Sequence, residues 1–231
     1  MFNAFELTGR ARSHVSQYLA PRFAAHPQAG AAFLAMREAA LADGFDLSPF
    51  STYRDYATQL RIWNNKFSGK KPLYDMAGQV RDTRAFTPDQ IIDCILNWSA
   101  LPGGSRHQWG TEIDVVDAAV MPPGYAPRLL PEEVAPGGLF HPMHCWLDQN
   151  MDRFGFFRPY RFYKGGMYPE PWHLSYAPVA SVALGLVTPD LLRRVTREAD
   201  ILGKELILPR IEQIYEQHVM NIVAPGEREA A

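Results

Sequence analysis

The sequence predicts an α+β domain in which helices flank a small antiparallel sheet. Three observations support this class. Helical and strand-like segments mix without the regular alternation of parallel α/β folds, the strand-like segments are short, and residues 188–223 form a helical C-terminal extension that Gly203 and Pro209 divide. At 231 residues the length suits one domain, which we expect to span 1–223. The small and charged residues of 224–231 predict a disordered tail.

The first half of the chain predicts three helices and one strand. Apolar residues recur at helical spacing over 31–44 and again over 56–67. Between them, 45–50 is typical of a short strand. The third helix, 87–98, begins with a capping box in the letters TPDQ. We expect the polar stretch 68–85 to be a loop.

The second half predicts three more strands around one helix. The strands are expected at 112–116, 154–160 and 171–176, and the helix at 143–155, where a glycine stops it. A long segment rich in Pro and Gly, 118–142, separates the first of these strands from the helix. Loops of that length are often functional, so this one is interpreted as a rim over a cleft.

Composition excludes several classes of partner. The 23 Lys and Arg nearly balance the 25 Asp and Glu, so no global charge favours nucleic acid or an anionic membrane. No stretch predicts a membrane span, and the first twenty residues lack the apolar region of a signal peptide, which predicts a cytoplasmic protein. Cys94 and Cys145 could pair or both be free. Two cysteines are too few for a disulfide scaffold or a cysteine zinc cluster.

A histidine, a carboxylate and a second histidine suggest a metal site. His107 precedes Asp114 by seven residues, at the entry to a strand, and His173 stands in the letters EPWH. Catalytic zinc takes three protein ligands and leaves its fourth position to water. Glu170 lies three residues before His173, and Pro171 favours a turn that lets both face one point.

These pieces resemble the VanY-type zinc D-Ala-D-Ala carboxypeptidases, in the fold group that includes lysostaphin and the hedgehog domain. The resemblance rests on three ordered stretches, STYRDYATQ, SRHQWGTEID and EPWH, and covers roughly residues 30–180. It implies an enzyme that hydrolyses the last peptide bond of a peptidoglycan stem peptide, or muropeptide, and releases D-alanine. It also implies one zinc ion per chain.

The resemblance assigns a role to each matching residue. His107, Asp114 and His173 would bind zinc, Glu170 would serve as catalytic base and acid, and Arg54 would polarise the scissile carbonyl or hold substrate. The remaining three positions are assigned to substrate binding: Gln59 and Ser105 near the terminal carboxylate, and Trp172 as an apolar wall.

Several of these assignments have a structural alternative. Arg54 could form a surface ion pair with Asp55, Gln59 could be a solvated helix position, and Ser105 a loop hydroxyl. Glu112 departs from the family, which has a small residue there. Strand alternation puts Glu112 on the side of Asp114, where it could contact a metal ligand from behind or be exposed to solvent.

A rival cluster of His141, His144 and Cys145 lacks an accompanying acid or base, so we interpret it as structural. The C-terminal helices, 188–223, are taken to cover the sheet.

Three other functions remain open. The zinc chemistry equally suits an L,D-carboxypeptidase acting on tetrapeptide stems. A peptidoglycan endopeptidase ranks lower, because Arg54 and Gln59 suit a free carboxylate. The fold can also carry a non-catalytic zinc-binding module, against which Glu170 argues. Because cross-linked peptidoglycan lies outside the cytoplasm, the expected location requires a precursor or recycled peptide as substrate. Alternatively, the protein is periplasmic through an unrecognised export route or a truncated start. The sequence does not indicate an oligomeric state.

Overall fold

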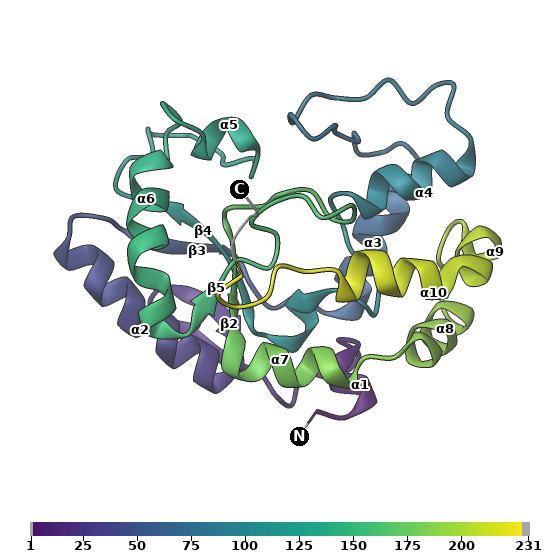
Figure 1. Cartoon of the computed structure of the whole chain (residues 1–231), viewed down its shortest axis with the longest axis horizontal. Helices are drawn as coiled ribbons and strands as arrows, with labels where there is room; N and C mark the ends of the chain where they lie inside the picture. The colour runs from purple at the N-terminus through teal and green to yellow at the C-terminus, as the bar shows by residue number, and fades with distance from the viewer. Residues whose placement is uncertain (1, 228–231) are drawn as a thin grey trace.

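A four-stranded antiparallel sheet carries the motif residues. In a computed structural model of the chain, which describes residues 2–227, the strand order is β3-β4-β6-β5. Its strands are β3 (Leu47–Ser51), β4 (Glu112–Asp117), β5 (Phe156–Phe157) and β6 (His173–Tyr176). Helices surround this sheet (Figure 1), which confirms the predicted α+β class.

The pairing of β4 with β6 aligns the motif residues across the sheet. Asp114 lies opposite His173, and Glu112 lies opposite Ser175. Successive side chains of a strand point to opposite faces, so the two acids of β4 share one face. On the other face, Ile113 is fully buried in the apolar core.

Two helices cover the apolar face of the sheet. These are α2 (Pro27–Ala42) and α6 (His141–Asn150), which contribute Phe33 and Met143 to the same buried cluster as Ile113. Both helices lie together on one side of the sheet in Figure 1. The helix predicted over 31–44 therefore begins earlier than expected.

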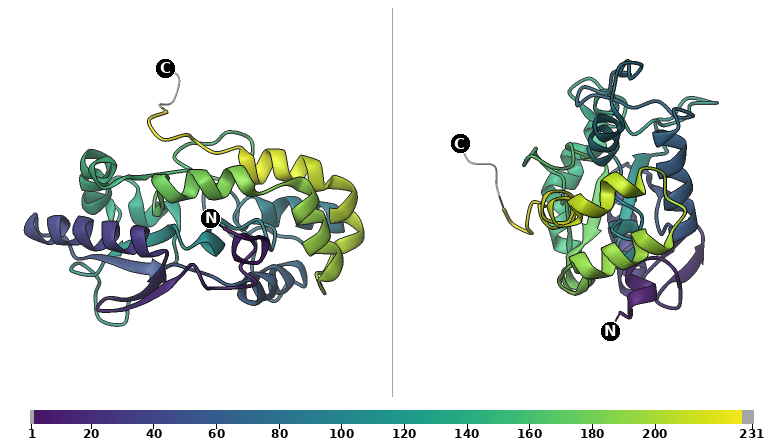
Figure 2. Two further views of the ribbon diagram at one scale, coloured as in Figure 1. Left: turned by 90° about the horizontal axis from the view of Figure 1, so that it is seen from below. Right: turned by 90° about the vertical axis from the view of Figure 1, so that its right-hand side faces the viewer.

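A second apolar core joins the middle helices to the C-terminal extension. The helices α3 (Tyr56–Phe67) and α4 (Pro88–Leu96) contribute Trp63 and Ile95, which pack with residues of the C-terminal helices. Figure 2 shows these C-terminal helices running along one side of the molecule. The C-terminal elements are α7 (Ala177–Leu186), α8 (Pro189–Glu198), α9 (Lys204–Ile207), η3 (Leu208–Arg210), α10 (Ile211–Ile214) and the π-helix η4 (Tyr215–Met220).

Several elements differ from the sequence-based expectations. The strand predicted over 154–160 has only two residues in β5, because a 3-10 helix, η2 (Met151–Phe154), precedes it and a loop follows. The short helix α1 (Ala4–Leu7), the hairpin of β1 (Ser16–Leu19) and β2 (Arg22–Ala25), and α5 (Pro131–Val134) were not predicted.

Residues 224–227 form a turn in which Glu227 pairs with Lys164, so this part of the predicted tail is folded. The rest of that tail, 228–231, lies outside the described residues. No helix within 2–227 is long and apolar enough to cross a membrane.

Candidate metal centre and its cavity

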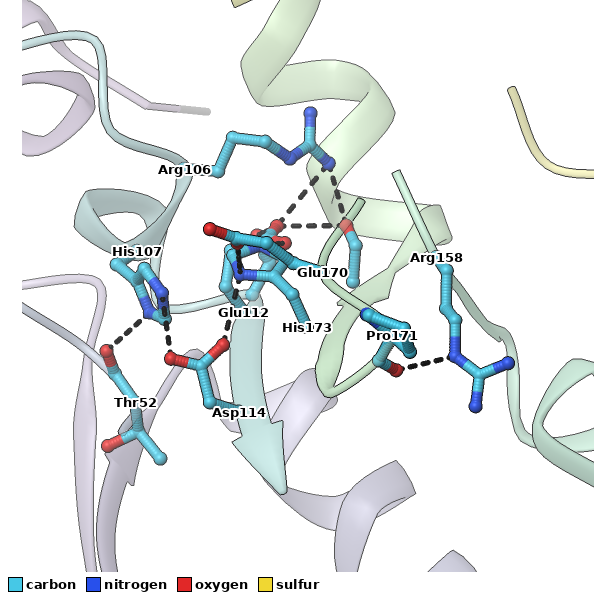
Figure 3. A network of polar contacts seen from close by, with 11 residues as sticks. Thr52, Arg106, His107, Glu112, Asp114, Arg158, Glu170, Pro171 and His173 are labelled. Atoms are coloured by element: carbon cyan, nitrogen blue, oxygen red, sulfur yellow. Dashed lines mark hydrogen bonds and ion pairs between the residues drawn. The ribbon is translucent and has the colours of Figure 1, made fainter. Parts of the chain in front are cut away.

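Three side chains from separate elements converge at one point (Figure 3). His107 lies in the 3-10 helix η1 (Arg106–Trp109), Asp114 lies in β4, and His173 opens β6. One ligand atom from each side chain lies within 4.8 Å of the other two, and all three residues are buried. The structure thus brings together the three residues that the sequence suggested as ligands.

The turn before β4 depends on Gly110. Its φ of +69° lies in the left-handed region, and a Cβ there would meet the backbone nitrogen of His26 at 2.7 Å. The carbonyl of Gly110 accepts a hydrogen bond from that nitrogen, also at 2.7 Å. Glycine is therefore required where the chain passes from His107 into the strand that carries Asp114.

Hydrogen bonds leave one ring nitrogen of each histidine facing this point. The Nδ1 of His107 lies 2.8 Å from the carbonyl of Thr52 and donates to it, so Nε2 faces Asp114 with its lone pair. The Nε2 of His173 lies 2.8 Å from Oε2 of Glu112, which leaves Nδ1 as the inward atom. A carbonyl or carboxylate behind the ring commonly orients a metal-binding histidine in this way.

Two inward atoms have no hydrogen bond to a third group among residues 2–227. The Nδ1 of His173 and Oδ1 of Asp114 are only 3.0 Å apart and both are buried, and because each carries a lone pair, a proton or a metal ion must lie between them. Buried polar atoms left unpaired are costly. Two imidazoles and a carboxylate are suitable ligands for a divalent transition metal, so the residues present fit such an ion.

The acid behind His173 is part of a buried polar network. Oε1 of Glu112 accepts hydrogen bonds from the hydroxyls of Thr111 and Ser175, both at 2.8 Å. Arg106 donates to the Ser175 hydroxyl at 2.7 Å and lies 3.3 Å from Glu112. Of the two alternatives for Glu112, the structure therefore supports the partner of a ligand and not the exposed acid, because its side chain is fully buried against His173.

Electrostatics keep this network charged. Burial alone would raise the pKa of Glu112, but Arg106 and the hydrogen bond to His173 outweigh burial and lower the pKa to about 2. Burial alone would lower the pKa of His173, yet Asp114 and Glu112 raise that pKa to about 10. In the metal-free chain His173 therefore holds a proton that a metal ion must displace.

Glu170 reaches the same point through a fixed turn. Its backbone nitrogen donates to the carbonyl of Tyr160 at 2.9 Å, and its own carbonyl accepts from the backbone nitrogen of His173 at 3.0 Å. Arg158 donates to the carbonyl of Pro171 at 2.6 Å. The carboxylate lies 3.5 Å from Nδ1 of His173. The expectation that Pro171 lets Glu170 and His173 face one point is confirmed.

Burial raises the pKa of Glu170 to about 7, and the nearby Asp114 adds to this increase. The positive charges of His173, Lys66 and Arg54 oppose it. A carboxyl group with a pKa near neutrality can both accept and donate a proton, as a general base and acid must.

A cavity of about 240 Å³ opens beside these residues. Arg54, Ser105 and Trp172 line it, and their contact with a substrate stays a prediction. Residues of the 118–142 segment also contribute, with Leu129 and Leu130 among the lining residues, so that segment forms a rim as expected.

Gln59 is not among the residues that line the cavity. Its side chain is fully buried, and Nε2 donates to the carbonyl of Ala100 at 2.7 Å. The suggestion that Gln59 is a solvated helix position is wrong. Through this hydrogen bond Gln59 supports the cavity wall, since Ala100 itself lines the cavity.

Sequence reasoning missed two further residues. Arg106 and Lys66 both line the cavity, but neither belongs to a recognisable spacing. Only the alternation of β4 hinted that Glu112 shares a face with Asp114, and nothing in the sequence indicated its partner Arg106.

The rival cluster does not form a comparable site within 2–227. His144 accepts a hydrogen bond from Arg158, and Cys145 lies 3.5 Å from a ring nitrogen of His141. Cys94 and Cys145 are both free thiols, so they do not pair.

Comparisons with known proteins place this geometry in context. The family model described as VanY, D-alanyl-D-alanine carboxypeptidase, matches residues 22–179. An uncharacterized protein from Haemophilus influenzae is 32% identical over 122 residues, which are 52% of this chain and 93% of that relative.

Two solved structures are similar in fold. VanYB in complex with D-alanine-D-alanine has a TM-score of 0.53 and 22% identity, covering 80% of this chain and 89% of the other. A mutant of the vancomycin-resistance D,D-pentapeptidase VanY, in complex with Zn(II), has a TM-score of 0.51 and 23% identity, covering 74% and 85%. At these identities the likeness establishes the fold.

Proposed function

The chain belongs to the VanY family of D-alanyl-D-alanine carboxypeptidases, and from that premise we propose that it hydrolyses the terminal D-Ala-D-Ala bond of peptidoglycan stem peptides. The observation that carries the proposal is the convergence of His107, Asp114 and His173 beside Glu170, in the lining of one cavity. A carboxypeptidase in this family acts on a peptidoglycan peptide, and the free end of that peptide would enter the cavity.

We propose zinc as the ion, one per chain, held by His107 Nε2, His173 Nδ1 and Asp114. Zinc in such a site supplies Lewis acidity and lowers the pKa of a water molecule to about 7. The ligand set supports this choice, and so does the zinc bound to the VanY relative of similar fold.

Glu170 carries out the proton transfers. Its carboxylate accepts the proton of the attacking water and then passes it to the amine of the leaving residue. The turn that holds Glu170 3.5 Å from His173 keeps the carboxylate beside the ligands throughout both transfers.

Arg54 stabilises the charge that develops on the carbonyl oxygen. Its backbone nitrogen donates to the carbonyl of His107 at 3.2 Å, which ties it to a ligand-bearing segment, and its Nε is buried with no partner in the part of the chain that the structure describes. A guanidinium held in this way is available to the substrate oxygen. Ser105 and Trp172 complete the binding surface as a hydroxyl and an apolar wall.

One experiment tests the reaction and the substrate together. Zinc-loaded protein is incubated with muropeptides that carry pentapeptide or tetrapeptide stems, and the products are identified by mass spectrometry. We expect pentapeptides to lose one D-alanine and tetrapeptides to remain intact, with no reaction for Glu170→Ala.

Each other outcome contradicts the proposal in a distinct way. Conversion of tetrapeptide to tripeptide would identify an L,D-carboxypeptidase, and cleavage of cross-linked dimers an endopeptidase. No reaction with any substrate, although zinc is bound, would indicate a non-catalytic module.

A further inference from the structure

Two cations of the cavity wall lie outside ion-pair distance of every carboxylate within residues 2–227. Arg106 is paired with Glu112, and Arg128, on the rim, is paired with Glu132. Arg54 and Lys66 also line the cavity, yet neither has an ion pair with a carboxylate of residues 2–227. Glu170 attracts both cations, and Asp114 attracts Arg54, but none of these pairs is in contact, so each cation can still bind an anionic group directly.

The two cations occupy different parts of the wall. Arg54 is bound through its backbone to His107, a ligand candidate. Lys66 lies in the last turn of α3, and its Nζ donates to the hydroxyl of Ser99 at 2.5 Å. Ser99 also lines the cavity, so the ammonium group is held against this wall.

The wall around Lys66 is rigidly supported. Ser99 is followed by Ala100, whose carbonyl accepts the hydrogen bond from Gln59, two turns earlier on the same helix. One helix therefore holds the segment at Gln59 and presents a charge beside it at Lys66. A charge fixed in advance loses little entropy when it binds a ligand.

A simpler explanation for the position of Lys66 is its interaction with the dipole of α3. Cations stabilise the last turn of a helix, and an exposed lysine would serve that purpose. Lys66 is instead half-buried, and desolvation lowers its pKa to about 8, against the opposing attraction of Glu170. A helix-dipole role alone gives no reason for this desolvation.

We propose that Lys66 binds the free C-terminal carboxylate of the peptide and thereby restricts the site to removal of a terminal residue. This inference rests on the proposed function and leaves Arg54 for the scissile carbonyl. A bond between ammonium and carboxylate is charge-assisted and stronger than a neutral hydrogen bond. A peptide that continues past the scissile bond would bring a neutral amide instead and leave the desolvated ammonium unpaired.

The test uses two synthetic peptides that differ only at the end. One is diacetyl-L-Lys-D-Ala-D-Ala with a free carboxylate, and the other is its C-terminal amide. Zinc-loaded wild type, Lys66→Met and Lys66→Arg are compared, with Lys70→Met as the matched control because Lys70 is exposed just beyond α3. Thermal melts verify that each variant is folded.

We expect Lys66→Met to lower kcat/KM for the acid by about 10- to 100-fold, chiefly through KM, and to lower that for the amide by no more than about threefold. The preference for the acid should then largely disappear, while Lys66→Arg retains most of it and Lys70→Met all of it. An unchanged ratio of acid to amide in Lys66→Met overturns the inference.

A binding measurement separates this inference from the proposed function. Calorimetric titration of zinc-loaded Glu170→Ala with each peptide reports affinity without turnover, and adding Lys66→Met should remove the preference for the acid. If the wild type cleaves neither peptide, the proposed function fails, while the titration still decides whether Lys66 recognises a carboxylate. Equal affinities for acid and amide before Lys66 is changed also overturn the inference.

Discussion

Nε2 of His173 lies 2.8 Å from Oε2 of Glu112, and both residues are buried. This pair fixes the ring so that Nδ1 faces Asp114 and the predicted metal position. Arg106 and the hydroxyl of Ser175 hold the acid in turn, so the orientation of one candidate ligand depends on residues that do not reach the ion.

Glu112→Gln should weaken metal binding. The amide retains the shape of the side chain but loses the negative charge that strengthens the hydrogen bond from Nε2 of His173. Since this hydrogen bond orients the ring toward the metal, we expect zinc affinity to fall about 10- to 100-fold. Competition with a chromophoric chelator measures this. Glu38→Gln, an exposed acid on α2, is the control.

Because Glu112→Gln leaves Arg106 without its partner, a melting curve must accompany the titration. Zinc affinity equal to that of wild type in a folded variant would show that the hydrogen bond does not position His173.

Removal of a ligand and removal of the base should have different effects. His107→Ala should lose the metal and activity together, since one of three ligands is gone, whereas Glu170→Ala should retain zinc and lose turnover. Metal content by mass spectrometry and D-alanine release distinguish them. A chelator should inactivate wild type, and added zinc should restore it. Full activity in Glu170→Ala would refute the proposed mechanism.

Arg54→Met should impair the chemical step while zinc remains bound. Loss of one donor to a developing oxyanion typically lowers kcat by about 100- to 1000-fold. Steady-state kinetics with a pentapeptide measure kcat and KM separately. An increase in KM alone would assign Arg54 to ground-state binding of the substrate.

Gln59→Met should destabilise the fold. It removes the donor to the Ala100 carbonyl, and leaving such a group unpaired costs about 1–3 kcal/mol in the free energy of unfolding. Urea denaturation measures this change. A stability equal to that of wild type, with a raised KM, would restore the direct contact with substrate that the family resemblance suggested.

The buried His218 should make stability depend on pH. Desolvation lowers its pKa from 6.5 to about 4, so the unfolded chain binds its proton more readily. Its contribution is present above pH 6.5 and is lost as pH falls from 6.5 toward 4. Between pH 7 and 5 this amounts to roughly 2 kcal/mol. Thermal melts of wild type should show a steeper loss over this interval than those of His218→Gln, and parallel curves would contradict the prediction.

The sequence by itself determined the local structure and the order of the motif. The capping box of Thr87 and Gln90 is present at the start of α4, because cap and helix are formed by neighbouring residues. The strands that contain Asp114 and His173 were also predicted from their own residues. The β1–β2 hairpin did not, because its first strand is largely exposed and lacks the apolar alternation by which strands are recognised.

Only the tertiary structure decided which polar residues meet. Glu112 and His173 are 61 positions apart, and their contact exists because β4 and β6 pair in one register. Gln59 reaches Ala100 and Lys66 reaches Ser99 through the packing of a helix against a distant segment. A hydrogen bond needs two atoms at about 3 Å, and such a distance between remote residues follows from the packing of the whole chain, which no local pattern records.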